Sequence, residues 1–312
     1  MKYTSIGDTS TKISQIGLGT WQFGSSGWGY GTDFTKDDAI AIVHKALDLG
    51  INLIDTAEVY GRGNSEKIIG EAIKGYDREQ IIISTKFMPL TVRPSSSIRA
   101  LQKSLKRLQT SYIDIYFIHW PNPVLPLGKT LHHLESMIDE GLIRYIGVSN
   151  FSMKRFQTAQ QKMQSYRIQL NQINYSLAKN KAEKKFLPYA MKEKITLMAY
   201  SPLAQGFLTG KYSINNVPKG TRGTNTLFRK KNLERGKPLL DLLETIGKKY
   251  DATPAQIALN WLIKDIAVVA IPGAKNLDQI ETNANAGKFE LLEEDLHQIR
   301  SVLEQFKPRL LF

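Results

Sequence analysis

Residues 50–61 read GINLIDTAEVYG, an apolar run of strand type that ends at Asp55 and is followed by Tyr60. Two further apolar runs, IIIST and IDIYFI, lead directly to Lys86 and His119. The steps of 31 residues from Asp55 to Lys86 and 33 residues from Lys86 to His119 each match one strand plus one helix of a parallel α/β barrel. We therefore expect the four side chains at neighbouring strand ends on one rim, where barrel enzymes carry their chemistry.

Runs of this kind recur along most of the chain at intervals of about 25 to 35 residues and alternate with segments of helical period. This alternation favours a (β/α)8 TIM barrel, and we expect it to form a single domain over residues 1–312. The runs predicted as strands are Ile16 to Gly19, Leu53 to Asp55, Ile81 to Lys86, Ile113 to Ile118, Tyr145 to Val148, Ile168 to Ile173, Ile195 to Tyr200 and Ala267 to Ile271.

Capping signals support helices between these strands. Thr35 with Asp38 resembles a capping box, and Thr253 followed by Pro254 resembles an N-cap with proline at the first helical position. The apolar spacing from Leu296 to Phe306 predicts one further helix near the end of the chain. These helices would pack outside the barrel.

Composition limits the class of protein. The 312 residues are 42% hydrophobic and 23% charged, as in soluble globular proteins with a large core. The chain has no cysteine, which excludes disulfides, thiolate nucleophiles and cysteine-ligated zinc. No apolar run reaches the roughly 20 residues that span a bilayer, and the start lacks a secretory signal. We expect a cytoplasmic protein without membrane contact.

The formal net charge of +13 fits nucleic acid, an anionic small molecule or a basic host proteome. Lysine and arginine are scattered, however, and the densest cluster, Arg229 to Lys231 with Arg235 and Lys237, lacks the interleaved aromatics of a single-strand binding surface. We expect no nucleic-acid partner. A phosphate-rich cofactor explains part of the excess positive charge.

Several ordered motifs resemble those of the aldo-keto reductase superfamily. Within it, the chain is most similar to the branch of bacterial general-stress and inositol-pathway reductases and potassium-channel β subunits. The matching segments are GLGTW at 17–21, DTAEVYG at 55–61, Lys86, HWP at 119–121, IGVSNF at 146–151, Gln172, YSPL at 200–203 and IPGAK at 271–275. The resemblance implies an (α/β)8 barrel that binds a nicotinamide cofactor without a Rossmann domain.

The four rim residues suit carbonyl reduction, in which a proton donor must stand at the oxygen while hydride reaches the carbon. Tyr60 is the candidate donor, with Lys86 as a nearby ammonium that lowers the pKa of the phenol. Asp55 would hold Lys86 charged, and His119 would orient the carbonyl oxygen. In alcohol oxidation Tyr60 would act as the base.

The resemblance also implies the cofactor contacts, and it places the cofactor at the C-terminal rim. Tyr200 would stack on the nicotinamide ring, and a 2′-phosphate would meet Lys275. The residues that match the nicotinamide pocket are Thr20, Trp21, Asp55, Ser149, Asn150, Gln172 and Tyr200; those of the pyrophosphate segment are Ser201, Pro202, Leu203, Ala204, Gln205, Lys211 and Arg222; those of the adenosine end are Gly273, Ala274, Lys275, Gln279 and Asn283.

The chain departs from the family at the adenosine end. Many relatives place arginine or lysine where it has Gly273, or arginine where it has Gln279, and Thr282 stands where an acidic residue is expected. Lys275 is then the only adjacent cation for a 2′-phosphate, and on charge pairing we favour NADP(H) over NAD(H).

Residues 203–236 contain no clear strand and many Gly, Asn, Thr, Lys and Arg residues. A long loop after a strand end is either a cofactor-covering lid or a surface insertion, and its position favours the lid.

The substrate is defined less sharply. Trp21, Trp28, Phe87 and Trp120 would line an apolar mouth beside His119, or would serve as packing residues. Short stretches after Lys86 and His119 suggest an open pocket and a broad range of small carbonyl or alcohol substrates.

The sequence contains two further motifs and permits one alternative function. Tyr175 and Lys179 fit the tyrosine-x3-lysine pattern of short-chain dehydrogenases, but the glycine-rich strand-turn-helix of that fold is missing, so we expect both in a loop. His132 and His133 lack metal partners, and we expect no catalytic metal.

The alternative to an enzyme is a cofactor-binding redox sensor with little turnover that acts on a partner protein. The sequence does not define the oligomeric state.

Overall fold

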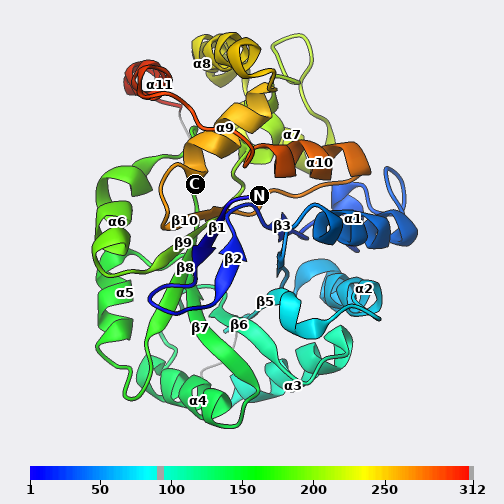
Figure 1. Ribbon diagram of the computed structural model, residues 1–312, viewed down its shortest axis with the longest axis vertical. Helices are drawn as coiled ribbons and strands as arrows, with labels where there is room; N and C mark the ends of the chain where they lie inside the picture. Colours follow the sequence, from blue (N-terminus) through cyan, green and yellow to red (C-terminus); the bar gives the residue numbers. More distant parts are fainter. Residues whose placement is uncertain (90–94, 309–312) are drawn as a thin grey trace.

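The computed structural model describes residues 1–89 and 95–308, and a sheet of eight parallel strands forms its centre (Figure 1). Each strand pairs with the next one along the chain. Parallel bridges from Ile16 to Ala270 and from Gly19 to Gly273 join the last strand to the first and close the barrel. The strands are β3 (Leu18–Gly19), β4 (Leu53–Asp55), β5 (Ile82–Phe87), β6 (Ile113–Ile118), β7 (Ile143–Ser149), β8 (Ile168–Asn174), β9 (Thr196–Tyr200) and β10 (Val268–Ala270). The predicted (β/α)8 barrel is confirmed, and each predicted run contains one of these strands or overlaps it.

Helices surround the sheet, and Figure 1 shows α1 to α6 arranged in sequence order around its outside. Both predicted caps are present, because Thr35 with Asp38 and Thr253 with Gln256 each form a complete capping box. The helices are α1 (Lys36–Asp48), α2 (Asn64–Ala72), α3 (Ser96–Leu108), α4 (Leu127–Asp139), α5 (Met153–Gln160), α6 (Lys181–Lys192), α7 (Gly220–Gly223), α8 (Lys230–Tyr250), α9 (Pro254–Ile263), α10 (Leu277–Asn285) and α11 (Glu293–Gln305).

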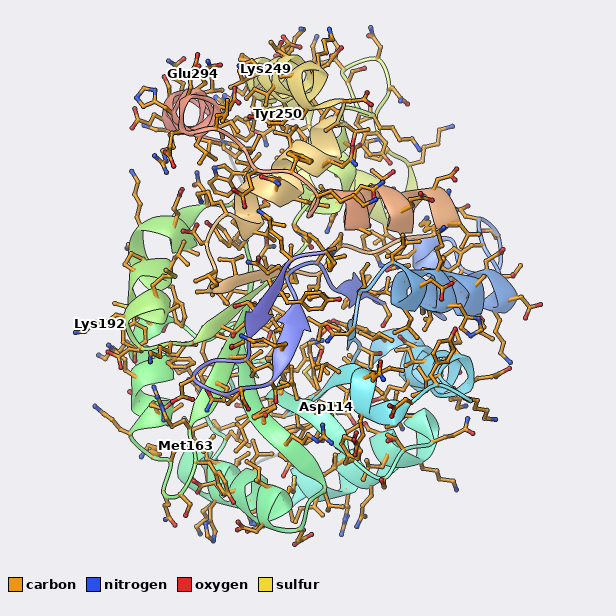
Figure 2. All side chains as sticks on the ribbon, in the orientation of Figure 1. Asp114, Met163, Lys192, Lys249, Tyr250 and Glu294 are labelled. Atoms are coloured by element: carbon orange, nitrogen blue, oxygen red, sulfur yellow. The ribbon has the colours of Figure 1, made fainter. Side chains whose placement is uncertain are left out.

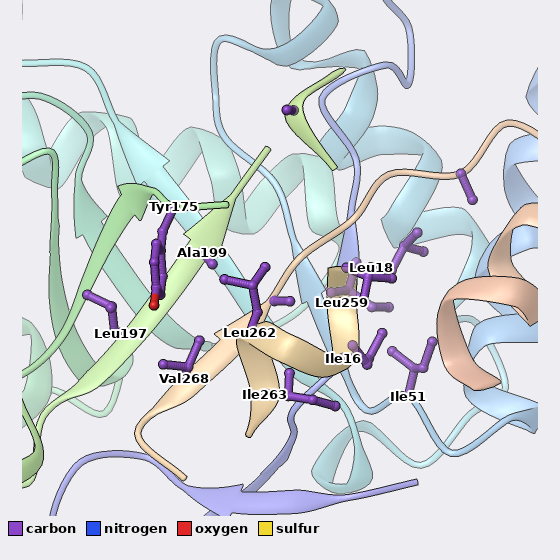
Figure 3. Packing of buried hydrophobic residues seen from close by; sticks show 14 of the residues in the cluster. Ile16, Leu18, Ile51, Tyr175, Leu197, Ala199, Leu259, Leu262, Ile263 and Val268 are labelled. Atoms are coloured by element: carbon purple, nitrogen blue, oxygen red, sulfur yellow. The ribbon is translucent and has the colours of Figure 1, made fainter. Parts of the chain in front are cut away.

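The outer core lies between the strands and the surrounding helices. Figure 3 shows Leu262 of α9 close to Val268 of β10, and Leu259 of the same helix close to Leu18 of β3; all four are buried. Removing this apolar surface from water stabilises the barrel by roughly 25 cal/mol for each Å² buried. The packing holds the strand ends in fixed positions.

The barrel interior is a second, smaller apolar cluster, made by side chains that alternate with those of the outer core along each strand. It is closed at one end by an antiparallel hairpin of β1 (Tyr3–Ser5) and β2 (Lys12–Ser14), which the sequence analysis did not predict. The interior cluster contains Ile6, Ile13, Leu53, Ile82, Ile115, Phe117, Leu170, Met198, Val269 and Ile271.

Residues 203–236 differ from the predicted loop, because residues 230–236 belong to α8. Gly236 and Pro238 resemble helix breakers in the sequence, but the buried Leu233, Leu239 and Leu243 draw the segment into a helix, since tertiary packing overrides local propensity. The remainder holds α7 and the 3-10 turns η4 (Ala204–Thr209) and η5 (Thr226–Phe228).

The predicted final helix is α11, and it packs on α8 outside the ring. Figure 2 shows Lys249 and Tyr250 of α8 close to Glu294 of α11. Lys249 Nζ and Tyr250 OH donate hydrogen bonds of 2.7 and 2.6 Å to the carboxylate of Asp295, which joins the two helices.

Candidate functional site at the carboxyl ends of the strands

Strand alternation aims the rim residues inward. In β5, Ile82 belongs to the interior cluster, so Ser84 and Lys86, two and four positions later, point the same way. Leu53 sets the same phase for Asp55 in β4. The inward-pointing Asp55, Ser84 and Lys86 therefore form a polar layer next to the apolar interior.

Asp55 and Lys86 form the centre of this layer. Lys86 Nζ donates to both carboxylate oxygens of Asp55, at 2.8 and 2.7 Å, and to the carbonyl of Thr56 at 2.7 Å. Ser84 Oγ and Gln172 Nε2 donate to Asp55 Oδ1 at 2.6 and 2.8 Å. The carboxylate thus holds four hydrogen bonds, which fix it and the lysine in one geometry.

Tyr60 lies beside this pair, with Lys86 Nζ 5.1 Å from the centroid of its ring. It begins a 3-10 turn, η2 (Tyr60–Gly63), in which Gly61 has φ 54°. A Cβ at Gly61 would stand 2.8 Å from the backbone oxygens of Phe23 and Gly24, so only glycine allows this close approach. The turn packs Tyr60 against the loop that follows β3.

The pKa of Tyr60 shifts against the sequence-based expectation. Burial and the Asp55 carboxylate raise the pKa of Tyr60 well above its ordinary value. The charge of Lys86 is paired with Asp55 at hydrogen-bond distance, so it does not outweigh the effects of burial and of the Asp55 carboxylate on the pKa of Tyr60. Burial also lowers the pKa of Lys86, while Asp55 acts to raise it. The phenol is therefore a protonated group over the whole neutral range.

His119 completes the group, with its ring centroid 5.9 Å from that of Tyr60. Burial, assisted by Lys86, lowers the pKa of His119 to about 3, so the imidazole is neutral at pH 7. Its Nδ1 atom is buried and has no hydrogen-bond partner in the described part of the chain. The structure thus brings the four rim residues together.

The predicted nicotinamide residues form a chain of hydrogen bonds next to Asp55. Tyr200 OH donates to Asn150 Oδ1 at 2.9 Å, and Asn150 Nδ2 donates to Ser149 Oγ at 3.0 Å. Ser149 Oγ donates in turn to the carbonyl of Gln172 at 3.0 Å. Asn150 adopts φ 62°, an unusual conformation for a residue other than glycine.

Thr20 and Trp21 leave β3 at the same rim. Thr20 is buried, and its hydroxyl donates to the carbonyl of Asp55 at 2.8 Å. Trp21 is 50% exposed, and its ring meets the Tyr60 ring edge-on at 4.8 Å. Thr20 therefore belongs to the buried part of the rim, whereas Trp21 lies at its exposed mouth.

The segment after β9 has a strained backbone. Ser201, Ala204 and Gln205 have φ values of 50°, 50° and 57°. Successive residues in turn conformations form concavities of backbone N–H groups that suit anions, and strain of this kind gathers at functional sites. Pro202 and Leu203 lie within the same segment.

Two predicted cations follow this segment. Arg222 Nη1 donates to Tyr212 OH at 2.8 Å, and its guanidinium carbon lies 5.6 Å from the Trp28 ring centroid. Arg222 Nε is buried without a hydrogen-bond partner among the described residues. Lys211 is exposed, with Nζ 5.9 Å from the Tyr212 ring centroid.

The predicted adenosine residues lie between β10 and α10. Lys275 N donates to Gln279 Oε1 at 2.9 Å, and Asn283 Nδ2 donates to the carbonyl of Gly273 at 3.3 Å. The carbonyl of Ala274 accepts from Gln22 Nε2 at 2.7 Å. The structure brings these residues together on one loop and helix.

Of the predicted mouth aromatics, Trp120 is 46% exposed and Trp28 is partly exposed. Trp28 contacts Trp21 edge-on at 6.3 Å, and Trp120 stacks on His119 at 6.4 Å. Phe87 is not among them: because Lys86 points inward, Phe87 points outward, where it is buried 5.4 Å from the Tyr116 ring. The prediction that Phe87 lines the mouth is corrected.

Two polar residues of the rim were missed. Ser84 was detectable, because it lies two positions before Lys86 on one strand and must share its face. Asp33 was not detectable, because its ion pair with Lys275 joins residues far apart in the sequence.

Tyr175 and Lys179 lie in a turn, as predicted. Within the described ranges, no cluster of three or more metal-ligating side chains and no helix that could span a membrane is found.

The chain matches the Aldo/keto reductase family over residues 15–304. It is 42% identical over 308 residues to an uncharacterized oxidoreductase of Mycobacterium tuberculosis, with 99% of this chain and 94% of that protein covered. It is 31% identical over 326 residues to the NADH-specific methylglyoxal reductase of Escherichia coli, with 97% and 99% covered. Among solved structures, it is similar to an aldo-keto reductase from Klebsiella pneumoniae in complex with NADPH, with TM-score 0.80, 29% identity and 100% of both chains covered.

Proposed function

Since this chain belongs to the aldo/keto reductase family, we propose that it is an NADP(H)-dependent oxidoreductase that reduces aldehydes or ketones to alcohols, with Tyr60 as the proton donor. The observation that carries the proposal is the convergence of Tyr60 with the Asp55–Lys86 pair and His119 on one rim. In this arrangement a protonated phenol and a neutral imidazole lie close together, next to partly exposed tryptophan side chains.

The residues of the rim fit a nicotinamide cofactor. Tyr200 offers an aromatic face, and Asn150 and Gln172 offer amide groups. The left-handed turn at Ala204 and Gln205 and the unpartnered Nε of Arg222 suit a pyrophosphate. We propose that residues 203–229 cover the bound cofactor. A reduced nicotinamide supplies the hydride that adds to a carbonyl carbon.

The side chains would handle the carbonyl oxygen. Tyr60 OH gives its proton to the oxygen as negative charge develops there, and the phenol regains a proton from solvent. Neutral His119 donates a hydrogen bond to the same oxygen and orients it. Lys86, held by Asp55, stabilises the phenolate that forms for a moment on Tyr60. The catalytic set is therefore Asp55, Tyr60, Lys86 and His119.

The preference for NADP(H) rests on Lys275 at the adenosine end. The relatives point both ways, because one is named as NADH-specific and another was solved with NADPH. For the substrate, Trp21, Trp28 and Trp120 support small carbonyl compounds that pack on aromatic rings.

The first test replaces Tyr60 by phenylalanine. Tyr60→Phe removes the donor proton and keeps the ring, so we expect turnover of a panel of aldehydes and ketones, followed by absorbance of NADPH, to fall at least about 100-fold. NADPH binding, measured by fluorescence titration, should change less than about twofold.

The matched control is Tyr175→Phe, since the Tyr175 hydroxyl is buried without a hydrogen-bond partner in the described part of the chain. This variant should keep full turnover. Turnover that survives in Tyr60→Phe would refute Tyr60 as the donor. NADPH binding by the native protein without turnover on any carbonyl would instead favour the cofactor-binding sensor.

A further inference from the structure

The loop after β3 meets the loop after β10 through the hydrogen bond from Gln22 to Ala274 and through one ion pair. Lys275 Nζ lies 2.7 Å from Asp33 Oδ2, with side chains that are 22% and 59% exposed. Lys275 lowers the pKa of Asp33, so the carboxylate is charged at neutral pH. The cation assigned to the 2′-phosphate therefore already holds an anion of the protein itself.

The backbone is shaped to allow this pair. Gly29 has φ 90°, and a Cβ there would collide with the Asp33 carboxylate and stand 2.9 Å from Lys275 Nζ. Asp33 N donates to the carbonyl of Gly29 at 2.7 Å, which closes a tight turn around the acidic residue. A side chain at Gly29 would displace the Asp33 carboxylate from its present position.

The same loop has a second contact across the rim. Its 3-10 turn η1 (Ser26–Trp28) packs on α7, where the Arg222 guanidinium lies near the Trp28 ring. Arg222 adds a weaker electrostatic attraction on Asp33. Asp33 is thus attracted by two cations that the proposed function assigns to cofactor phosphates, chiefly by Lys275.

We propose that Asp33 is a specificity-determining residue whose carboxylate competes with the 2′-phosphate of the cofactor for Lys275. A dianionic phosphate near Lys275 would repel Asp33 and must replace its ion pair, whereas a 2′-hydroxyl leaves the pair intact. Asp33 therefore weakens the preference for NADP(H) that Lys275 provides. This inference rests on the proposed function, since it needs a nucleotide at the adenosine end.

The experiment compares two probes that differ by one phosphate, adenosine 2′,5′-bisphosphate and adenosine 5′-monophosphate, by calorimetric titration of the full chain. Asp33→Asn should tighten binding of the bisphosphate about twofold to fivefold, in line with a partly exposed ion pair. Binding of the monophosphate should change less than about twofold. In a Lys275→Gln background, Asp33→Asn should no longer alter the ratio of the two affinities.

The matched control is Asp37→Asn, which makes the same charge change at an exposed residue of α1 that forms no ion pair among the described residues. It should leave both affinities unchanged. Equal changes for both probes in Asp33→Asn, or none, would overturn the competition while NADPH binding by the native protein still upheld the proposed function. If the native protein binds neither NADPH nor either probe, both proposals fall.

Discussion

Lys86 carries a positive charge into the barrel, and Asp55 balances it at hydrogen-bond distance. Because this charge is balanced, burial dominates the pKa of Tyr60 and raises it. A group that stays protonated suits the donor of a reduction better than the base of an oxidation. In the proposed mechanism the pair acts chiefly through the geometry that it fixes.

The pKa of His119 predicts how stability depends on pH. In the folded protein this pKa is about 3, and in the unfolded chain it is near 6.5, so below pH 6.5 the unfolded state binds more protons. The contribution of His119 to stability is fully present above pH 6.5 and is lost as the pH falls towards 3. In urea unfolding between pH 7 and pH 4.5, His119→Gln should lose less free energy of unfolding than the native protein.

The control for this measurement is His132→Gln, at an exposed position of α4. It should follow the native protein over the same range. Equal pH dependence in the native protein and in His119→Gln would show that other groups determine acid sensitivity.

At this scale the sequence predicts residues on strands well and contacts between loops poorly. Asp55, Lys86 and His119 could be placed on one rim because strand periodicity fixes their phase. The same periodicity, applied to Phe87, would have shown that it points outward. The pair of Asp33 with Lys275 depends on how two irregular loops cross, and no local pattern encodes that.

Among the elements, α9 has the clearest local signal. Thr253 Oγ1 accepts from Gln256 N at 3.3 Å, and Gln256 Oε1 accepts from Thr253 N at 2.7 Å. Pro254 occupies the first helical position. The sequence predicted this start because each contact lies within one turn. The β1–β2 hairpin escaped prediction because each of its strands has only three residues and carries a weak pattern.

Removing this cap should destabilise the protein by about 1 kcal/mol, since an N-cap threonine satisfies a backbone N–H that alanine leaves unpaired. We expect Thr253→Ala to lower the urea midpoint accordingly. Thr245→Ala is the matched control, because Thr245 lies exposed within α8, where alanine favours the helix. A Thr253→Ala variant as stable as the native protein would mean that packing alone holds α9 in place.

For the whole molecule, the hairpin connects the beginning of the chain to its last strands. Thr4 Oγ1 donates to the carbonyl of Ile266 at 2.7 Å. Gln15 Nε2 lies 3.2 Å from the carbonyl of Ile263 and 3.1 Å from that of Val268. The hairpin therefore acts as part of the barrel and closes the end opposite the candidate site.

Ile13→Ala should cost about 2–5 kcal/mol of unfolding free energy, because it leaves a cavity in the barrel interior. The proposed activity at 25 °C should stay within about twofold, since the change lies at the other end of the barrel. Ile214→Ala, at an exposed loop position, is the control and should be nearly neutral. A loss of activity without a loss of stability in Ile13→Ala would contradict this separation.

The hairpin also bears on synthesis. Ile6 and Ile13 leave the ribosome well before Val269 and Ile271, which belong to the same interior cluster. The apolar face of the hairpin is not fully covered until β10 has emerged as well. Pairings over such sequence distances form slowly, and exposed apolar surface invites aggregation during the delay. The hairpin therefore exposes its apolar face for longer during synthesis than the strands nearer β10 do.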